Sequence, residues 1–487
     1  MAWLAAGGLP RGVLRLAERA GAAVSGRGLA RLGRPAYPLL TRQHHGGPIG
    51  GLPRVGGASG PTRGPLAVGA TATTAGVRRA SQAGSSTTSE GDSAGTGPRF
   101  LALARDDAAR LYRLTDDRGR QLAFPYVWLR DNCRCPGCYH ESSWQRALAL
   151  DALDPEIVPA AESLGSDGRL LSIDWPDGHR SDFPADWLHR LRHWEATEDP
   201  VGRPQLQAFG GELTGRIPTF DFQALLRDDR ALHDWLHTLN TLGLALVTGA
   251  PTDKDVNRRL VKKVAFIKPT TYGEEFQVYS KRDASNLAYT AKGLDLHIDL
   301  PYYNYTPGIQ MLHCIEQAGV SGGENQFVDG LRVAEWVRQE APHHYHLLST
   351  QEVDFRDIGY EETVGDFHLK LRRTTIQHNK YGDFQCLNFN NHVRAPHLTL
   401  PVDKVTDLYR ALKYFLEVMN RPELLVEHKL SAGEIATFNN GRVLHGRSAY
   451  VTDGDSTRHL VGAYFDWDEG HSRLRVLRQK LFGELPV

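Results

Sequence analysis

Residues 296–303 read LHIDLPYY, and the rest of the chain can be interpreted outward from this short segment. In an extended strand, side chains two positions apart face the same side, so His297 and Asp299 would present one imidazole and one carboxylate to a common point. This pair suits a non-haem Fe(II) ion, which two histidines and one carboxylate can hold on one face while other coordination positions stay open. A further histidine ligand is therefore expected elsewhere.

A second histidine lies in residues 436–447, ATFNNGRVLHGR, which read as a hairpin interrupted by a turn. His445, among apolar and glycine neighbours, is the candidate third ligand. Arg458 follows thirteen residues later and opens the alternating run RHLVGAY. Its guanidinium could bind the distal carboxylate of 2-oxoglutarate through two parallel hydrogen bonds while the keto-acid end reaches the metal. The combined pattern is more specific than any of its parts.

The overall composition excludes several classes of protein. The 487 residues include 57 basic and 57 acidic side chains, so no global field favours nucleic acid or an anionic membrane. No apolar run approaches the roughly 18 residues of a transmembrane helix, so we expect no membrane segment. Five cysteines, three of them clustered, fit a reducing compartment better than a disulfide framework.

Residues 1–98 are predicted to be a leader. Up to residue 89 the sequence is rich in arginine, alanine, glycine and serine, and Glu18 is its single acidic residue. Residues 11–19, RGVLRLAER, form a short basic amphipathic segment. This profile is typical of a mitochondrial transit peptide, and we expect residues 45–98 to be disordered. The alternatives are that the bias reflects base composition and that the protein is cytoplasmic.

Residues 99–200 are predicted to form a small zinc-binding β domain. Residues 124–132, FPYVWLRDN, read as an apolar strand that leads into CRCPGC, where Pro-Gly bends the backbone and gathers three thiolates. Zn²⁺ then needs one more ligand to close a tetrahedral site, which would be structural and would contribute to folding. The alternative is three buried or reactive thiols without metal. The candidate ligands are Cys133, Cys135 and Cys138 with His179, or with His140 or His189 as the fourth.

Residues 201–487 are predicted to form the catalytic domain. Short strands punctuated by Gly or Pro are expected at 242–249, 309–315 and 326–330, and a helix at 405–419. Ligands carried on strands of opposite sheets suggest a double-stranded β-helix, a jelly-roll architecture with the metal between the sheets and helices on its flanks. The fold class is therefore mainly β.

Four of these segments resemble the gamma-butyrobetaine dioxygenase family: the cysteine module and residues 297–303, 438–447 and 458–468. The resemblance extends over essentially everything except the leader. It implies Fe(II), 2-oxoglutarate, O₂, ascorbate as activator, a structural zinc, a homodimer, and hydroxylation of gamma-butyrobetaine to L-carnitine. The residues it implies are His297, Asp299 and His445 for iron, Cys133, Cys135, Cys138 and His179 for zinc, and Arg458 for the 2-oxoglutarate carboxylate.

The same resemblance implies a binding site for the substrate. A trimethylammonium group is charged but has no N–H donor, so aromatic faces select it better than hydrogen-bond acceptors do. Phe276 stands where the family has tryptophan, although phenylalanine still presents a π surface. For any one of these aromatics, ordinary core packing is the alternative. By the family's pattern the cage is Tyr272, Phe276, Tyr289 and Tyr464, and the substrate carboxylate contacts Asn286 and Asn390.

Two other functions compete with this interpretation. Trimethyllysine dioxygenase acts on the same cation with an amino acid at the other end, and a mitochondrial leader would suit it. The LPYY segment after the ligand pair and the complete three-cysteine module favour the butyrobetaine enzyme. A catalytically silent zinc-dependent scaffold is the third possibility, and the intact set of iron and 2-oxoglutarate residues argues against it.

Overall fold

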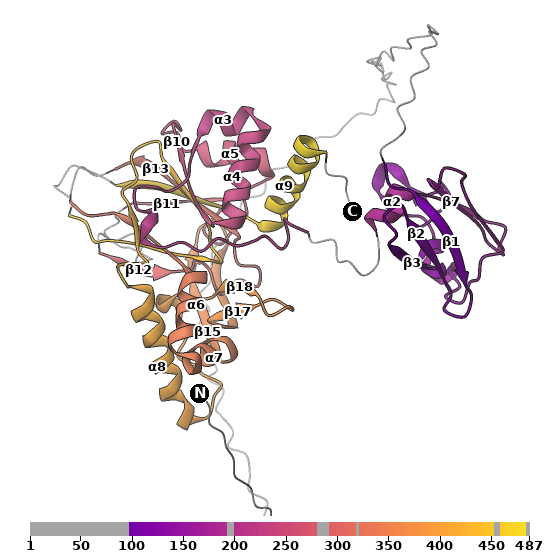
Figure 1. Ribbon diagram of the computed structural model, residues 1–487. Coiled ribbons are helices and arrows are strands. Elements are labelled where there is room, and N and C mark those ends of the chain that lie inside the picture. Colours follow the sequence, from indigo (N-terminus) through magenta and orange to yellow (C-terminus); the bar gives the residue numbers. More distant parts are fainter. Residues whose placement is uncertain (1–96, 192–198, 280–291, 318–320, 452–457, 484–487) are drawn as a thin grey trace, which may run out of the picture. The chain divides into compact units, whose positions relative to one another are not determined.

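The computed structural model describes residues 97–191, 199–279, 292–317, 321–451 and 458–483 (Figure 1). The predicted leader, residues 1–98, therefore lies almost entirely outside the described residues. Within the described ranges, no helix is both long and apolar enough to cross a membrane.

The N-terminal part of the described chain contains two three-stranded antiparallel sheets. They pack around a core whose buried members all lie between Phe100 and Leu188, including Tyr112, Phe124 and Trp175. The elements are β1 (Phe100–Asp106), β2 (Leu111–Asp116), β3 (Gln121–Pro125), α1 (Tyr126–Asp131), β4 (Tyr139–His140), β5 (Gln145–Arg146), β6 (Ala161–Leu164), β7 (Leu170–Asp174), β8 (Arg180–Pro184) and α2 (Ala185–Arg190).

The strand predicted at 124–132 is wrong beyond Pro125. The chain leaves β3 at Pro125, which has no N–H to extend the ladder, and continues as helix α1. The buried residues of α1 are Tyr126, Leu129 and Arg130, which follow the i, i+3, i+4 spacing of one helix face. The segment is apolar, as a strand would be, but its buried residues recur at the period of a helix.

Two further sheets form the body of the second part of the chain. The six-stranded sheet has the order β11-β22-β13-β20-β10-β9, and the four-stranded sheet has the order β12-β21-β14-β19. From β11 to β14, and again from β19 to β22, consecutive strands alternate between the two sheets, which is the strand order of a double-stranded β-helix. The bounds are β9 (Thr219–Asp221), β10 (Leu244–Thr248), β11 (Glu275–Val278), β12 (Leu294–His297), β13 (Ile309–Glu316), β14 (Asn325–Asp329), β19 (Val426–His428), β20 (Ile435–Asn439), β21 (Val443–Arg447) and β22 (His459–Phe465).

The two sheets share one apolar core. Leu312 and Phe438 of the six-stranded sheet pack in the same cluster as Phe327, Val426 and Val443 of the four-stranded sheet. Alternation along each strand sends the next side chains to the outer faces, where helices cover them. The prediction of a mainly β fold with flanking helices is confirmed, as are the strands expected around 242–249, 309–315 and 326–330.

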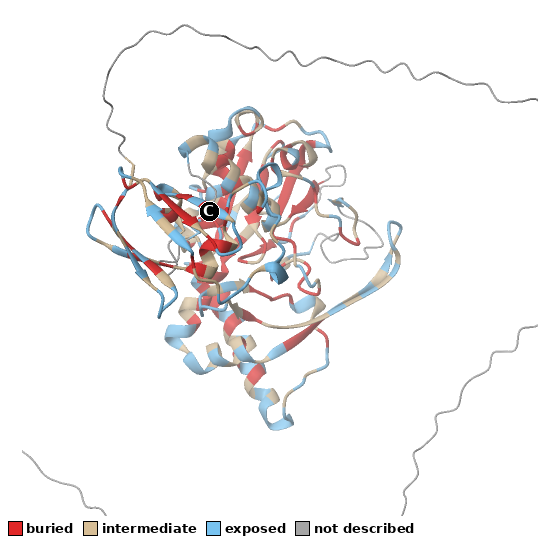
Figure 2. Cartoon of the chain, turned by 90° about the vertical axis from the view of Figure 1, so that its right-hand side faces the viewer, coloured by how far each residue is buried: buried red, intermediate tan, exposed pale blue. Residues whose placement is uncertain are grey.

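Helices cover the outer faces of both sheets (Figure 1). Trp235 of α4 packs with Met311 on the six-stranded sheet, and Phe415 of α8 packs with Leu444 on the four-stranded sheet. Figure 2 shows buried residues concentrated in the sheets and on the helix faces turned towards them. The helices are α3 (Phe222–Arg227), α4 (Asp229–Thr241), α5 (Val256–Val264), α6 (Gly330–Glu340), α7 (Pro342–Thr350), α8 (Val402–Met419) and α9 (Trp467–Phe482).

Between β14 and β19 the chain inserts α6, α7, α8 and four additional strands. A long antiparallel hairpin pairs β15 (Glu352–Glu361) with β16 (Gly365–Thr374), and a short one pairs β17 (Ile376–His378) with β18 (Phe384–Leu387). The helix predicted at 405–419 is confirmed as part of α8.

The hairpin predicted for residues 436–447 is wrong. Strands β20 and β21 are consecutive, but β20 pairs with β10 and β13, whereas β21 pairs with β12 and β14. The turn between them carries the chain from one sheet to the other. Asn440 anchors this crossing, because its side-chain amide donates to the carbonyls of Asp299 and Pro307.

Candidate metal centre and active site

Three side chains, from β12, the loop after it and β21, converge inside the double-stranded β-helix. Both strands belong to the four-stranded sheet, so the expectation that the ligands lie on opposite sheets is wrong. His297 is the last residue of β12 and pairs directly with His445 on β21. The Nε2 atom of His297 lies 3.1 Å from Oδ1 of Asp299, and Nε2 of His445 lies 3.6 Å from the same oxygen. All three ligand atoms lie within 4.8 Å of one another. The two histidines are buried, so the three donors face a shielded point.

The extended geometry assumed for the His-x-Asp pair holds only in part. Strand β12 ends at His297, and Asp299 lies in the following loop, where Leu300 adopts a positive φ of 56°. Asn440 fixes this loop in two places, because its Oδ1 accepts from the Asp299 N–H at 2.9 Å and its Nδ2 donates to the Asp299 carbonyl at 3.0 Å. Asp299 lies beyond the end of β12, so the strand does not fix its carboxylate. The turn between β20 and β21, which carries Asn440, holds it in place instead.

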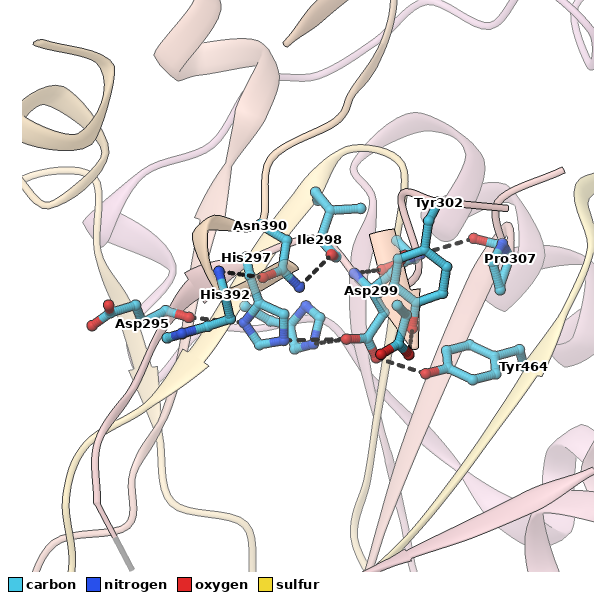
Figure 3. A network of polar contacts seen from close by, with 12 residues as sticks. Asp295, His297, Ile298, Asp299, Tyr302, Pro307, Asn390, His392 and Tyr464 are labelled. Atoms are coloured by element: carbon cyan, nitrogen blue, oxygen red, sulfur yellow. Dashed lines mark hydrogen bonds and ion pairs between the residues drawn. The ribbon is translucent and has the colours of Figure 1, made fainter. Parts of the chain in front are cut away.

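Hydrogen bonds around the three residues orient their donor atoms (Figure 3). Nδ1 of His297 lies 2.8 Å from the Asp295 carbonyl, which can only accept, so this nitrogen carries the proton and Nε2 offers its lone pair. On the other side, the Tyr464 hydroxyl donates to Oδ2 of Asp299 at 2.6 Å. Each of these two ligands is held by a partner outside the metal set, which is typical of metal sites.

The charge states of Asp299 and His445 fit a divalent cation. Burial opposes ionisation of Asp299, but His445, His297 and the Tyr464 hydroxyl outweigh it and hold the carboxyl pKa far below its usual range. Burial and the neighbouring His297 lower the pKa of His445 to about 3, so its imidazole is neutral at physiological pH. A neutral imidazole beside an ionised carboxylate is the protonation state that metal binding requires. Two histidines and one carboxylate suit Fe(II) and leave positions open.

Arg458 lies immediately before β22 and is only 4% exposed. Its Nη2 donates to Oδ1 of Asn325 at 3.3 Å, and burial, with the nearby Arg447, lowers its pKa to about 10, so it stays charged at neutral pH. Asn325 pairs with Arg447 in the β14–β21 ladder, and Arg447 is two positions after His445 on the same face of β21. The guanidinium therefore contacts a residue of β14 that lies two strand positions, or about 7 Å of strand, from the cross-strand partner of His445.

The sequence pattern predicts that Arg458 binds the distal carboxylate of a dicarboxylate held at the metal, and this role stays a prediction. Sequence reasoning identified Arg458 but missed Asn325 and Arg447. Arg447 could have been found from its i+2 relation to His445, whereas Asn325 has no local signal, because its place depends on the pairing of β14 with β21.

Three of the four predicted cage aromatics belong to one apolar cluster. Tyr464 is buried in this cluster, with Tyr272 and Phe276 packed against it. The rings of Phe276 and Tyr464 are stacked, with centroids 5.2 Å apart. Gly462, the cross-strand partner of Phe276, makes room for that ring, because a Cβ there would lie 2.0 Å from Cζ of Phe276. Tyr289 lies outside the described residues.

The predicted carboxylate-binding amides are only partly described. Asn390 lies against the metal segment, because its Nδ2 donates to the carbonyl of Ile298 at 3.3 Å and its Oδ1 accepts from the backbone of His392 (Figure 3). Asn286 lies outside the described residues.

The three clustered cysteines meet one histidine in the N-terminal part of the chain. Nε2 of His179 lies 3.2 Å from the sulfur of Cys133, 3.6 Å from that of Cys135 and 3.5 Å from that of Cys138. The two alternative histidines make other contacts, since His140 bonds to Ser143 and His189 stacks on Phe100. The four donor atoms form a closed Cys₃His group of the kind that holds Zn²⁺ in proteins.

The chain also matches known families and proteins. The family model described as "Taurine catabolism dioxygenase TauD, TfdA family" matches residues 202–464, and "Gamma-butyrobetaine hydroxylase-like, N-terminal" matches residues 104–189. Gamma-butyrobetaine dioxygenase from Homo sapiens is 38% identical over 77% of this chain and 96% of its own length. The protein of that name from Pseudomonas sp. (strain AK-1) is 35% identical over 74% of this chain and 92% of its own length.

A second group of relatives carries a different name. Mitochondrial trimethyllysine dioxygenase from Mus musculus is 31% identical over 74% of this chain and 84% of its own length. The two family models cover ranges in both parts of the described chain, and the range of the TauD, TfdA model contains positions 297, 299 and 445. The chain therefore belongs to the TauD, TfdA family and is a dioxygenase of the group that contains gamma-butyrobetaine dioxygenase and trimethyllysine dioxygenase.

Proposed function

We propose that this chain hydroxylates gamma-butyrobetaine at C3 to give L-carnitine, coupled to oxidative decarboxylation of 2-oxoglutarate to succinate and CO₂. The observation that carries the proposal is the convergence of His297, Asp299 and His445 on one buried point. The higher identity to gamma-butyrobetaine dioxygenases than to trimethyllysine dioxygenases supports the choice of substrate.

The three converging residues would hold Fe(II), which when bound supplies the activation of O₂ that oxidises both the keto acid and the substrate. Arg458 would bind the distal carboxylate of 2-oxoglutarate, with Asn325 fixing the guanidinium. No side chain needs to act as a general base. The contribution of the protein is to position the two organic substrates and to exclude water from the buried centre.

The aromatic cluster would bind the trimethylammonium group. Tyr272, Phe276 and Tyr464 offer π faces within one cluster, and each well-placed ring is worth about 0.5 to 2 kcal/mol towards a cation. Tyr464 would connect the two halves of the site, because its ring belongs to the cage while its hydroxyl holds Asp299. Tyr289 would complete the cage, and Asn286 and Asn390 would contact the substrate carboxylate.

Further parts of the proposal rest on the sequence and on the resemblance. Zn²⁺ would be held by Cys133, Cys135, Cys138 and His179 as a structural ion, and ascorbate would keep the iron reduced. The arginine-rich leader supports import into mitochondria, with the cytoplasm as the alternative location. We also propose a homodimer, with no nucleic-acid or membrane partner.

Trimethyllysine dioxygenase remains the second candidate function, favoured by the leader. The test is a succinate-release assay in which gamma-butyrobetaine and trimethyllysine are offered in parallel to full-length protein supplied with Fe(II), 2-oxoglutarate and ascorbate. We expect faster turnover of gamma-butyrobetaine, with L-carnitine as the product. Faster turnover of trimethyllysine would overturn the choice of substrate, and no turnover of either compound would favour the silent scaffold.

A further inference from the structure

We propose that Asp357 is a positioning residue that holds the phenol of the cage residue Tyr272 and that of the neighbouring Tyr302, and makes the site selective for a positively charged head group. The proposal rests on the proposed function, because it assumes that a quaternary ammonium is bound here. No local sequence pattern marks this residue, which lies on the long hairpin inserted between β14 and β19.

One carboxylate oxygen of Asp357 accepts two phenolic hydrogen bonds. Its Oδ2 lies 2.7 Å from the hydroxyl of Tyr272 and 2.7 Å from the hydroxyl of Tyr302. These tyrosines precede Asp357 by 85 and 55 residues in the sequence. The hairpin therefore contacts two segments of the site that come much earlier in the chain. Tyr302 is 5% exposed and belongs to the same apolar cluster as Tyr464.

Other residues of the same hairpin also pack around Tyr272. On the face of β15 that carries Asp357, Val353 and Phe355 are buried in the same cluster. Phe367, the cross-strand partner of Gly359, lies over that glycine and meets the Tyr272 ring edge to face, with centroids 6.5 Å apart. Tyr272 is thus held at its hydroxyl by a carboxylate and at its ring by an aromatic neighbour.

The hydrogen-bond arrangement has an electrostatic consequence for the ring faces. A phenol that donates to a carboxylate has a more electron-rich ring, and the carboxylate adds a negative charge behind the cage, so a cation is attracted more strongly than a neutral group of the same shape. Burial, with Tyr272 and Asp357 nearby, raises the pKa of Tyr302 far above its usual range, so this phenol stays a neutral donor.

The proposed role of Asp357 is consistent with the presence of Phe276 in the cage, where the family has tryptophan. Phenylalanine offers a weaker cation–π face than tryptophan does. A carboxylate behind the neighbouring Tyr272 offsets that weakness without contacting the substrate. Asp357 therefore acts through Tyr272 and Tyr302.

The experiment separates charge recognition from a merely structural contact. Asp357→Asn keeps an acceptor oxygen and nearly the same shape but removes the charge, and Asp357→Ala removes both. Asp366→Asn removes a charge from an exposed position of the same hairpin and is the matched control. Full-length protein is loaded with Fe(II) and 2-oxoglutarate without oxygen and titrated calorimetrically with gamma-butyrobetaine, trimethyllysine and 5,5-dimethylhexanoate. The last compound is the carbon isostere of gamma-butyrobetaine, in which an uncharged tert-butyl group replaces trimethylammonium.

We expect Asp357→Asn to weaken binding of the preferred trimethylammonium compound by about tenfold and Asp357→Ala by more, while binding of the tert-butyl isostere and of 2-oxoglutarate is unchanged. Asp366→Asn should bind as the wild type does. Equal losses for the cation and its isostere, or no loss for either, would overturn the role of Asp357. If the wild type prefers trimethyllysine, only the choice of substrate fails and the same comparison holds with that ligand. If the wild type binds neither cation, both proposals fail.

Discussion

The Tyr464 hydroxyl donates a 2.6 Å hydrogen bond to Oδ2 of Asp299, which joins an aromatic ring of the proposed cage to a carboxylate of the proposed metal set. The bond joins β22 of the six-stranded sheet to the loop after β12 of the four-stranded sheet. It therefore fixes the carboxylate from the opposite side of the core to the two histidines, which come from β12 and β21.

Tyr464→Phe should weaken metal binding while leaving the cage ring in place. Loss of a partner that orients a metal ligand typically costs about 10- to 100-fold in metal affinity or activity. We expect a loss of this size when Fe(II) is titrated into metal-free protein. Tyr414→Phe, which removes an exposed phenol bonded to Glu340, is the control. Equal Fe(II) affinity in the two variants would contradict the role given to Tyr464.

Cys138→Ser should remove the metal from the N-terminal part of the chain. We expect zinc content to fall from about one equivalent to near zero, because a closed four-ligand site loses one of its thiolates. The segment around residues 99–191 should then become sensitive to limited proteolysis, since zinc binding contributes to its folding. Cys386→Ser, which alters a cysteine outside the cluster, should retain its zinc. Unchanged zinc content in Cys138→Ser would refute the assignment.

Asp329→Ala should destabilise the body of the fold. Asp329 and Arg442 form a two-bonded ion pair with both side chains at most 2% exposed, and Asp329 also accepts from the backbone of Phe209 and Leu331. Removing one partner of a buried pair leaves an uncompensated charge and costs about 3 to 5 kcal/mol. Urea unfolding should show this loss.

The matched control for this prediction is Glu340→Ala, which breaks a partly exposed pair with Arg421 and should cost less than about 1 kcal/mol. Because Arg442 immediately precedes β21, the strand that carries His445, Asp329→Ala should also lower Fe(II) affinity. If the two substitutions lowered the free energy of unfolding equally, the larger contribution assigned to the buried pair would be contradicted.

His313 should make stability fall at mildly acidic pH. This histidine is fully buried on β13, and burial lowers its pKa from the ordinary value of about 6.5 to about 4. The unfolded chain therefore binds a proton first as the pH falls, so the stabilisation is complete above about pH 6.5 and is lost progressively towards pH 4. The loss is on the order of 3 kcal/mol. His313→Leu should flatten this part of the profile of unfolding free energy against pH, and an unchanged slope would contradict it.

The two clusters of candidate metal ligands could be predicted from the sequence because each group contains a short pattern of reactive side chains. His297 and Asp299 are two positions apart, and Cys133, Cys135 and Cys138 lie in six residues. The predicted partners, His445 and His179, each follow a turn or lie beside one. Local spacing limits which atoms can meet, so chemistry with known ligand preferences can be assigned from it.

The sheet to which each strand belongs could not be predicted in the same way. Strands β20 and β21 are both almost continuously buried, so alternation gives no sign of which neighbours they take. A hairpin and a crossing between two sheets have the same apolar-turn-apolar pattern. The contacts of Asp357, Asn325 and Tyr464 depend on pairings of 55 to 165 residues in sequence separation, for which a single sequence offers no signal.

The central claim is that two imidazoles and one carboxylate hold a single Fe(II) ion inside the double-stranded β-helix. The most direct test is anomalous diffraction from crystals of protein loaded with Fe(II) without oxygen, with data collected on both sides of the iron absorption edge. We predict one iron peak within bonding distance of His297, Asp299 and His445. Iron bound elsewhere, with no peak among these three side chains at full Fe(II) loading, would contradict the account.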